Sequence, residues 1–134
     1  MIRVVRLGSP RAKDEGPRIG TVRRPPRGVP KTEYASRDIY DVWLPGLAPS
    51  EPLVKAALGS RDEESWRRFV RRYRTEMRRP EALHLLDLLA ALSRTSDFSV
   101  GCYCADESRC HRSVLRELLR EHGALLAEAG GKRA

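Results

Sequence analysis

Three cysteines and a histidine are the residues of this sequence best suited to chemistry. All three cysteines of the chain, Cys102, Cys104 and Cys110, fall within nine residues of the stretch GCYCADESRCHRSVL, and His111 and Arg112 directly follow the last of them. A thiol near His and Arg at a helix start is shifted towards thiolate, which is the nucleophilic form. Histidine titrates near neutral pH and can carry a proton as a general acid or base. The stretch therefore predicts a catalytic thiol with a proton carrier beside it.

Two of these cysteines are candidates for the nucleophile. Cys110 is the first, because it directly precedes His111. Cys104 is the second, because Cys104 to Arg109 has a Cys-x4-Arg spacing like that of sulfur-transfer and phosphate-transfer loops, although the glycines of such loops are missing. Cys102 is expected to pack as a small buried side chain.

The residues around the nucleophile predict an anion-binding helix N-terminus. Ser108 is a suitable N-cap, which would place Arg109 and the Cys-His pair in the first helical turn. A helix N-terminus offers free backbone N–H groups and the positive end of the helix dipole. Arg109 and Arg112 would add charge-assisted hydrogen bonds to a phosphate or carboxylate. Asp106 or Asp41 is available to orient the histidine.

A zinc site is the rival interpretation of the same stretch. Cys102, Cys104, Cys110 and His111 supply four potential ligands. Zinc ligands usually come as cysteine pairs separated by about two to four residues. Here a single residue separates Cys102 from Cys104, and Cys110 and His111 are adjacent. This spacing makes it difficult for all four side chains to bind one zinc ion with tetrahedral geometry. The sequence therefore predicts no metal and no cofactor.

The elements that position this stretch alternate between strands and helices. Strands are expected at residues 1–7, 39–44 and 98–104, the second apolar enough to be covered on both faces. Helices are expected at residues 51–58, from Ser60 or Asp62 to residue 77, at 80–93 (well buried) and at 109–122. This order favours an α/β fold, a single three-layer domain with a small, mostly parallel sheet flanked by helices. In such sheets ligands gather at the carboxyl ends of the strands, which is where the cysteines fall.

Length and composition indicate one small domain. The chain has 134 residues, 40% of them hydrophobic and 33% charged, which is enough for one core. We expect a domain over residues 1–124, with a long Arg-, Pro- and Gly-rich loop or arm at 9–37, and a flexible tail at 125–134. The sequence has neither an apolar run long enough for a membrane span nor an apolar secretory segment at its start. The odd cysteine count fits reduced thiols, so we expect a cytoplasmic protein.

The net charge of +8 is concentrated in two segments. Residues 1–37 carry ten basic and three acidic residues, and residues 66–79 carry seven and one. Such segments suit nucleic acid or a phosphate-bearing small molecule as partner. The residues expected to bind it are Arg18, Arg23, Arg24 and Arg27 in the long loop, and Arg71 and Arg72 on a helix face. The alternative is a general preference for Arg over Lys that fills ordinary solvated positions.

The cysteine stretch also resembles a known family. CYCADESRCHRSVLREL, with YDVWLPGLAPS and WRRFVRRYRTEM upstream, is similar to the proteins grouped as domain of unknown function 488, from Ile2 to Gly123. The family's Cys, acidic stretch and Cys-His-Arg correspond here to Cys104, Asp106 or Glu107, Cys110, His111 and Arg112. The resemblance implies an α/β fold, a cytoplasmic prokaryotic protein, a Cys-His-Arg unit at a helix start, and no established activity.

Two functions follow from these observations. The first is a small enzyme, or a degenerate one, with an anion pocket at the end of the last strand and a nucleotide or nucleic-acid-derived phosphate as substrate. The second is a non-catalytic nucleic-acid-binding module that uses its Arg-rich surfaces. A homodimer stays open, since nothing in the sequence fixes the oligomeric state.

Overall fold

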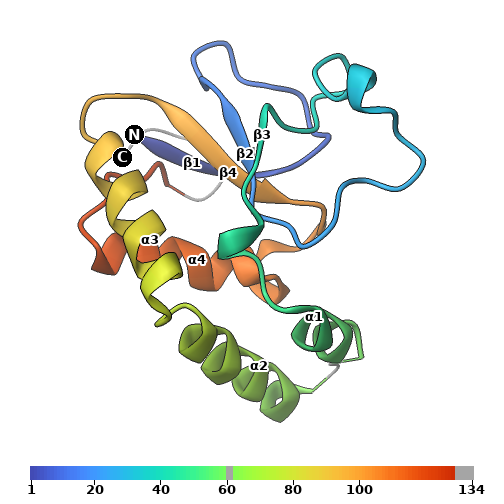
Figure 1. Cartoon of the computed structure of the whole chain (residues 1–134), viewed down its shortest axis with the longest axis vertical. Helices are drawn as coiled ribbons and strands as arrows, with labels where there is room; N and C mark the ends of the chain where they lie inside the picture. Colours follow the sequence, from blue (N-terminus) through green and yellow to red (C-terminus); the bar gives the residue numbers. More distant parts are fainter. Residues whose placement is uncertain (60–61, 129–134) are drawn as a thin grey trace.

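The computed structural model describes residues 1–59 and 62–128, which form a four-stranded sheet and four α-helices (Figure 1). The strands are β1 (Ile2–Arg6), β2 (Arg18–Gly20), β3 (Val42–Trp43) and β4 (Phe98–Cys102). The helices are α1 (Glu51–Leu58), α2 (Glu63–Glu76), α3 (Pro80–Leu92) and α4 (His111–Glu121). Short 3-10 turns are η1 (Lys31–Glu33), η2 (Pro45–Leu47) and η3 (Glu107–Arg109). No described helix has both the length and the apolar character needed to cross a bilayer.

The sheet is entirely parallel, with the strand order β1-β4-β2-β3. One edge of β4 pairs with β1, so that Arg6 lies opposite Cys102, and its other edge pairs with β2. The α/β class and the small parallel sheet predicted from the sequence are thus confirmed. Because β4 is an inner strand, the carboxyl end that carries Cys102 is flanked by chain on both sides.

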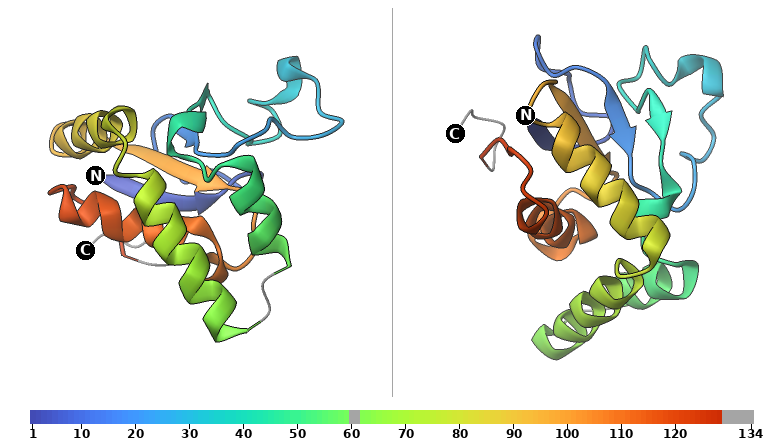
Figure 2. Two further views of the ribbon diagram at one scale, coloured as in Figure 1. Left: turned by 60° about the horizontal axis from the view of Figure 1, so that its bottom comes forward. Right: turned by 60° about the vertical axis from the view of Figure 1, so that its left-hand side comes forward.

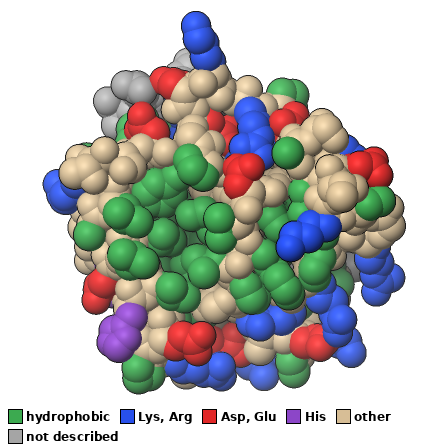
Figure 3. Space-filling view, turned by 45° about the horizontal axis from the view of Figure 1, so that its top comes forward, with side chains coloured by type: hydrophobic (Ala, Val, Ile, Leu, Met, Phe, Trp, Pro, Cys, Tyr) green, Lys and Arg blue, Asp and Glu red, His purple; other side chains and the backbone are tan. Residues whose placement is uncertain are grey.

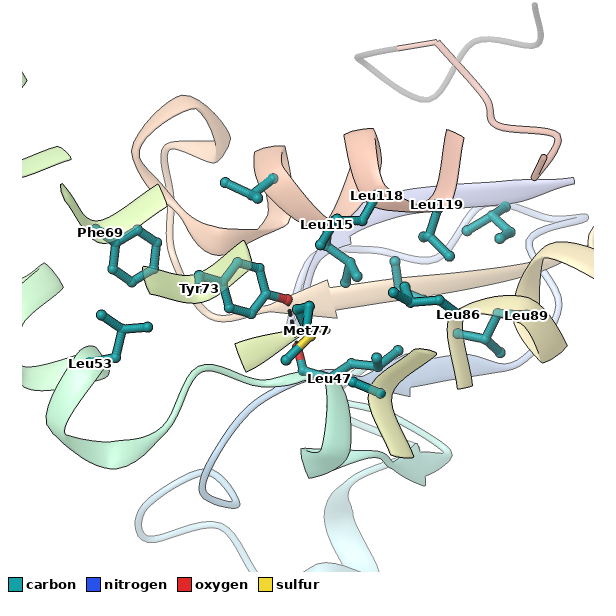
Figure 4. Close-up of a cluster of buried hydrophobic side chains, with 14 of the residues drawn as sticks. Leu47, Leu53, Phe69, Tyr73, Met77, Leu86, Leu89, Leu115, Leu118 and Leu119 are labelled. Atoms are coloured by element: carbon teal, nitrogen blue, oxygen red, sulfur yellow. Dashed lines mark hydrogen bonds between the residues drawn. The ribbon is translucent and has the colours of Figure 1, made fainter. Parts of the chain in front are cut away.

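The helices pack on one face of the sheet and enclose the main hydrophobic core. Ile2 of β1 and Phe98 of β4 point to that face together, because they are register partners in neighbouring strands, and they cluster with side chains of α2, α3 and α4. The helices α3 and α4 are in contact and lie side by side in the right-hand view of Figure 2. Figure 4 shows their leucines extending to one side of the buried Tyr73 of α2, whose hydroxyl donates to the Leu47 carbonyl at 2.6 Å.

The opposite face of the sheet is covered by irregular chain. The side chain of Arg18 is fully buried there, and its Nε donates to Glu15 Oε2 at 2.6 Å. The Ser99 hydroxyl donates to the same carboxylate at 2.8 Å, and Arg18 also donates to the carbonyls of Ser9 and Asp38 at 2.7 Å. The third layer is therefore built by the long Arg- and Pro-rich segment, which contains the strand β2. The expectation that Arg18 belongs to an anion-binding arm is wrong, because its guanidinium holds this layer to the sheet.

Some apolar residues are less buried than their sequence pattern predicts. The expected strand at 39–44 is reduced to the edge strand β3, whose Val42 and Trp43 are 49% and 43% exposed, so it is not covered on both faces as predicted. The helix α3 is not buried all round, since Leu88 is 52% exposed. Figure 3 shows hydrophobic side chains adjoining one another on one face of the molecule. An apolar run in this sequence is thus not sufficient evidence of burial.

The first residues of the predicted flexible tail are anchored to the sheet. The Ile2 N–H donates to the Leu125 carbonyl at 2.8 Å, and the Ala127 N–H donates back to the Ile2 carbonyl at 2.8 Å. Arg116 of α4 donates to the Ala127 carbonyl at 2.8 Å. These bonds place the chain around Leu126 beside β1 as a parallel bridge. Residues 129–134 of the predicted tail lie outside the described residues.

Candidate functional site

The three cysteines lie where β4 ends and α4 begins. Gly101 permits the close approach of β4 to β1 at this point, because a Cβ on Gly101 would lie 2.6 Å from the Val5 carbonyl oxygen. Cys102 ends β4 and is buried, whereas Cys104, two residues later, is exposed. After η3 the chain returns with Cys110, which is buried directly beside Cys102.

Cys110, rather than Ser108, is the N-cap of α4. The helix begins at His111, and the backbone N–H of Arg112 donates to Cys110 Sγ at 3.5 Å. Ser108 lies in η3, where the Asp106 carboxylate accepts from its N–H at 3.0 Å and from its hydroxyl at 2.7 Å. The predicted cap is wrong because this local turn uses the serine and ends in extended backbone before the helix starts.

The three sulfur atoms form one cluster. Cys102 Sγ lies 2.7 Å from Cys110 Sγ, and both thiols interact with Cys104. Hydrogen bonds from Cys102 and Cys110 hold the pKa of Cys104 well below the usual thiol value, and the hydrogen bond to Cys104 raises the pKa of Cys102 far above it. For Cys110, the bond with Cys102 lowers the pKa, but the bond with Cys104 and burial outweigh it and raise the pKa to about 11. The exposed Cys104 is therefore the sulfur of this cluster that loses its proton most readily.

His111 lies behind the thiols as a neutral imidazole. Its Nε2 is 2.7 Å from the carbonyl oxygen of Thr21, and since a carbonyl only accepts, Nε2 carries the proton. Nδ1 is then an unprotonated acceptor, and it lies 3.7 Å from Cys110 Sγ. Burial lowers the pKa of His111 to about 4, so the ring is uncharged at neutral pH. Its edge packs against Tyr73, with the ring centroids 5.6 Å apart.

Arg112 places a buried cation beside the thiol cluster. The residue is 3% exposed, and its Nη2 donates to the Cys104 carbonyl at 2.6 Å. Its Nε has no hydrogen-bond partner in the part of the chain that the structure describes. A buried guanidinium needs a negative neighbour, and Cys104, whose thiol pKa is lowered by its hydrogen bonds to the other two thiols and in part by Arg112, is the sulfur of this cluster that can supply the charge.

Arg109 and Asp41 are engaged elsewhere. Arg109 donates to Glu63 of α2 at 2.6 Å and lies over the ring of Trp66, 5.6 Å from its centroid. The Asp41 carboxylate accepts from Arg11 at 2.7 Å and from a backbone N–H of β2. The structure therefore brings neither residue to the thiols or to the imidazole, while it does bring together the Cys-His-Arg unit at residues 110–112.

A pocket of about 570 Å³ opens over the exposed side of the cluster. One wall is the chain after β2, another is α1 with the proline before it, and the floor includes His111. The lining residues are Val22, Arg23, Arg24, Pro25, Pro26, Arg27, Pro49, Glu51, Val54, Lys55, Leu58, Cys102, Tyr103, Cys104 and His111. The pocket therefore combines basic and apolar side chains around one exposed thiol.

The arginines predicted to bind an anion differ in their partners. Arg23 donates to the carbonyls before α1, at 3.0 Å to Pro49 and 3.1 Å to Ala48, and Arg24 pairs with Glu51. These contacts fasten the pocket wall to α1. Arg27 lines the pocket and is exposed. Two further predicted residues, Arg71 and Arg72, are exposed on α2 and do not line this pocket.

Sequence reasoning missed the wall that follows β2. Thr21 fixes the imidazole through its carbonyl, and the Tyr103 hydroxyl donates to the Arg24 carbonyl at 3.2 Å. Residues 21–27 follow no strand or helix period, so periodicity could not place them. The pair of prolines in RRPPR does predict a stiffened segment, but no local signal predicts its contacts with the imidazole and with Tyr103.

Comparison with known proteins identifies a family without identifying an activity. A family model described as the active DUF488-N3 subclade matches residues 2–123. Neither the curated proteins nor the solved structures include a match to this chain.

Proposed function

The chain belongs to the DUF488-N3a family, and from the geometry of its site we propose that it is an enzyme whose nucleophile is Cys104. The proposed substrate is a nucleotide or a related organic phosphate bound in the pocket over this thiol. The observation that carries the proposal is the position of Cys104, which is the exposed cysteine of the cluster and lies in the pocket lining. Cys110, the first candidate from sequence, is 3% exposed and less accessible to a substrate.

The lining of the pocket supports an organic anion as substrate. Arg27 offers an exposed guanidinium for a phosphate group, and the buried cation of Arg112 lies below the thiol cluster. Val54, Leu58 and the two prolines of the wall provide apolar surface for a sugar or base. A site with apolar walls and a few cations suits a nucleotide better than it suits inorganic phosphate.

The proposed chemistry is a nucleophilic displacement at Cys104. The sulfur forms a bond to the reacting atom of the substrate while the bond to the leaving group breaks, and the leaving group takes a proton from water. A second water molecule then cleaves the bond to sulfur and restores the thiol. His111 holds the neighbouring Cys110 from behind and lines the pocket floor, which makes it a positioning residue in this scheme.

The test is turnover and covalent trapping in matched variants. Wild-type protein is incubated with a panel of nucleotides and phosphate esters, and both released product and intact protein mass are measured. We expect turnover by the wild type, its loss in Cys104→Ser, and its retention in Arg71→Ala, which alters an exposed residue outside the pocket. Equal turnover by wild type and Cys104→Ser would overturn the proposal.

A nucleic-acid-binding function is the second candidate, because α2 presents a row of exposed arginines. Arg67, Arg71 and Arg72 are exposed on this helix, and Arg68 pairs only loosely with Glu64 at 3.7 Å. Binding through such a face must weaken steeply as salt rises, because neutralised phosphates release counterions. Filter binding of single- and double-stranded oligonucleotides across a salt series distinguishes the two functions. Affinity that is unchanged in Arg71→Ala/Arg72→Ala would exclude this face.

A further inference from the structure

The two buried cysteines and the imidazole together form a set of metal-binding donors. Cys102 Sγ, Cys110 Sγ and a ring nitrogen of His111 all lie within 4.8 Å of one another, and all three residues are buried. We propose that these three side chains bind Zn²⁺, with Cys104 as the fourth ligand. This inference goes beyond the proposed function and does not depend on it, because metal binding is measured without substrate.

The sulfur–nitrogen distance between Cys110 and His111 is close to that of a tetrahedral zinc site, whereas the two buried sulfur atoms lie closer together than in such a site. With Zn–S and Zn–N bonds of about 2.3 and 2.0–2.1 Å, tetrahedral angles put a sulfur and a nitrogen ligand about 3.6 Å apart. The observed separation of Cys110 Sγ and His111 Nδ1 is 3.7 Å. Two thiolates on the same ion are about 3.8 Å apart, so Cys102 and Cys110, now 2.7 Å apart, need to separate by about 1 Å.

The imidazole is already in the state that a zinc ligand requires. Metal-binding histidines almost always donate their second ring N–H to a carbonyl or carboxylate, which fixes the ring and its tautomer. His111 Nε2–H donates to the Thr21 carbonyl at 2.7 Å, which leaves Nδ1 unprotonated on the side of the thiols. The wall residue that sequence reasoning missed is thus the outer partner of the proposed site.

The buried cation beside the cluster matches the charge of a zinc centre with three thiolates. Zn²⁺ with three thiolates and a neutral imidazole has a net charge of −1. Arg112 is 3% exposed, its Nε has no partner among the described residues, and it lies beside Cys102 and Cys110. A buried guanidinium is costly without an opposite charge, and the proposed centre supplies one such charge.

Cys104 is the proposed fourth ligand, from the exposed side. Its sulfur lies outside the set of donors within 4.8 Å of one another, so its side chain, which is exposed and lines the pocket, has to turn towards them to bind the ion. Thiolate donors with imidazole favour zinc among the common biological divalent ions, whereas magnesium and calcium prefer oxygen ligands. A metal-bound thiol is held deprotonated, which is also the form that a nucleophilic Cys104 needs.

The experiment measures metal in the full-length protein kept reduced by a thiol-free reductant. The protein is loaded with Zn²⁺, freed of loosely bound ion by gel filtration and analysed for metal content, and Co²⁺ is used in parallel as a spectroscopic probe. We expect about one zinc ion per chain. We also expect a Co²⁺ spectrum with thiolate charge-transfer bands and the strong visible bands of a tetrahedral site.

Variants separate this site from adventitious binding. Cys110→Ser and Cys104→Ser are expected to weaken zinc binding by at least the ~10–100-fold that loss of an outer-shell partner causes. His84→Ala is the matched control, because His84 is exposed on α3, and it should bind zinc as the wild type does. Wild-type protein that retains no zinc, or a Co²⁺ spectrum without thiolate bands, would overturn the proposal. Both measurements use the wild type, so they decide the question even if Cys110→Ser fails to fold.

Discussion

The imidazole of His111 donates from Nε2 to the carbonyl oxygen of Thr21 across 2.7 Å, and this bond joins the start of α4 to the chain that leaves β2. It has two consequences for the site. The bond fixes the tautomer, with Nδ1 towards Cys110, while burial keeps the ring uncharged, and the wall of the pocket is joined to the segment that carries the thiols. The geometry of the cluster therefore depends on a contact between residues 90 positions apart in the sequence.

Removing the buried hydroxyl of Tyr73 tests the packing that supports this floor. The hydroxyl donates to the Leu47 carbonyl at 2.6 Å, and the ring packs against His111. Tyr73→Phe leaves a buried carbonyl without that donor, so we expect the free energy of unfolding to fall by about 1–3 kcal/mol. Urea denaturation followed by circular dichroism measures the change. An unchanged midpoint would show that the hydrogen bond does not stabilise the fold.

Adding a methyl group to Gly101 tests the close approach of β4 and β1. A Cβ at this position would lie 2.6 Å from the Val5 carbonyl oxygen and 2.9 Å from the Leu7 side chain. We expect Gly101→Ala to destabilise the protein by about 1–3 kcal/mol through overpacking. Gly59→Ala is the matched control, because a Cβ there meets nothing nearer than 3.8 Å, and its thermal midpoint should not fall. Equal midpoints for the two variants would contradict this account of the strand pair.

The buried pair of Glu15 and Arg18 predicts a loss of stability in acid. Burial raises the pKa of Glu15, but the hydrogen bonds from Arg18, Ser99 and Ala12 outweigh it and lower the pKa below the ordinary 4.5. Because the pKa of Glu15 is lower in the folded than in the unfolded protein, its ionised carboxylate stabilises the fold at any pH above the unfolded-state pKa of about 4.5. This stabilisation is lost as the pH falls from about 4.5 through the folded-state pKa. Urea denaturation as a function of pH measures this loss.

Glu15→Gln separates this pair from the general effect of acid. The variant leaves the fully buried Arg18 without its counter-charge, so we expect about 3–5 kcal/mol of destabilisation at neutral pH and a weaker dependence on pH below 4.5. Glu64→Gln is the control, since the side chain of Glu64 is 83% exposed on α2 and contributes little. A Glu15→Gln profile parallel to that of the wild type would contradict the assignment.

The sequence predicts the regular elements of this protein better than it predicts the site. The apolar stripe of α2 and the Pro80 start of α3 are local signals, and both helices form close to their expected bounds. The strand β2 is three residues long inside an Arg- and Pro-rich segment, and its place in the sheet depends on the buried Arg18. Arg18 and Glu15 are only three residues apart, but no local pattern reports that this pair is buried against Ser99 of β4.

The same limit applies to the residues of the cluster. Cys110, His111 and Arg112 could be predicted to lie together because they are consecutive residues at the start of a helix. Nearness in sequence did not reveal which thiol is exposed, since that depends on how the loop after Cys104 folds back over Cys102. The sequence also predicted Arg109 at the site, but in the structure its side chain pairs with Glu63 of α2 instead.

The most direct test of the central claim is the rate at which each cysteine is alkylated in the native protein. Metal is first removed with a chelator, the protein is treated with iodoacetamide at neutral pH, and each site is followed by peptide mass spectrometry. We predict that Cys104 reacts at least ~10-fold faster than the buried Cys102 and Cys110, and faster than a cysteine of the unfolded chain. A Cys104 that reacts no faster than an unfolded-chain thiol, or more slowly than Cys110, would contradict the claim that it is the nucleophile.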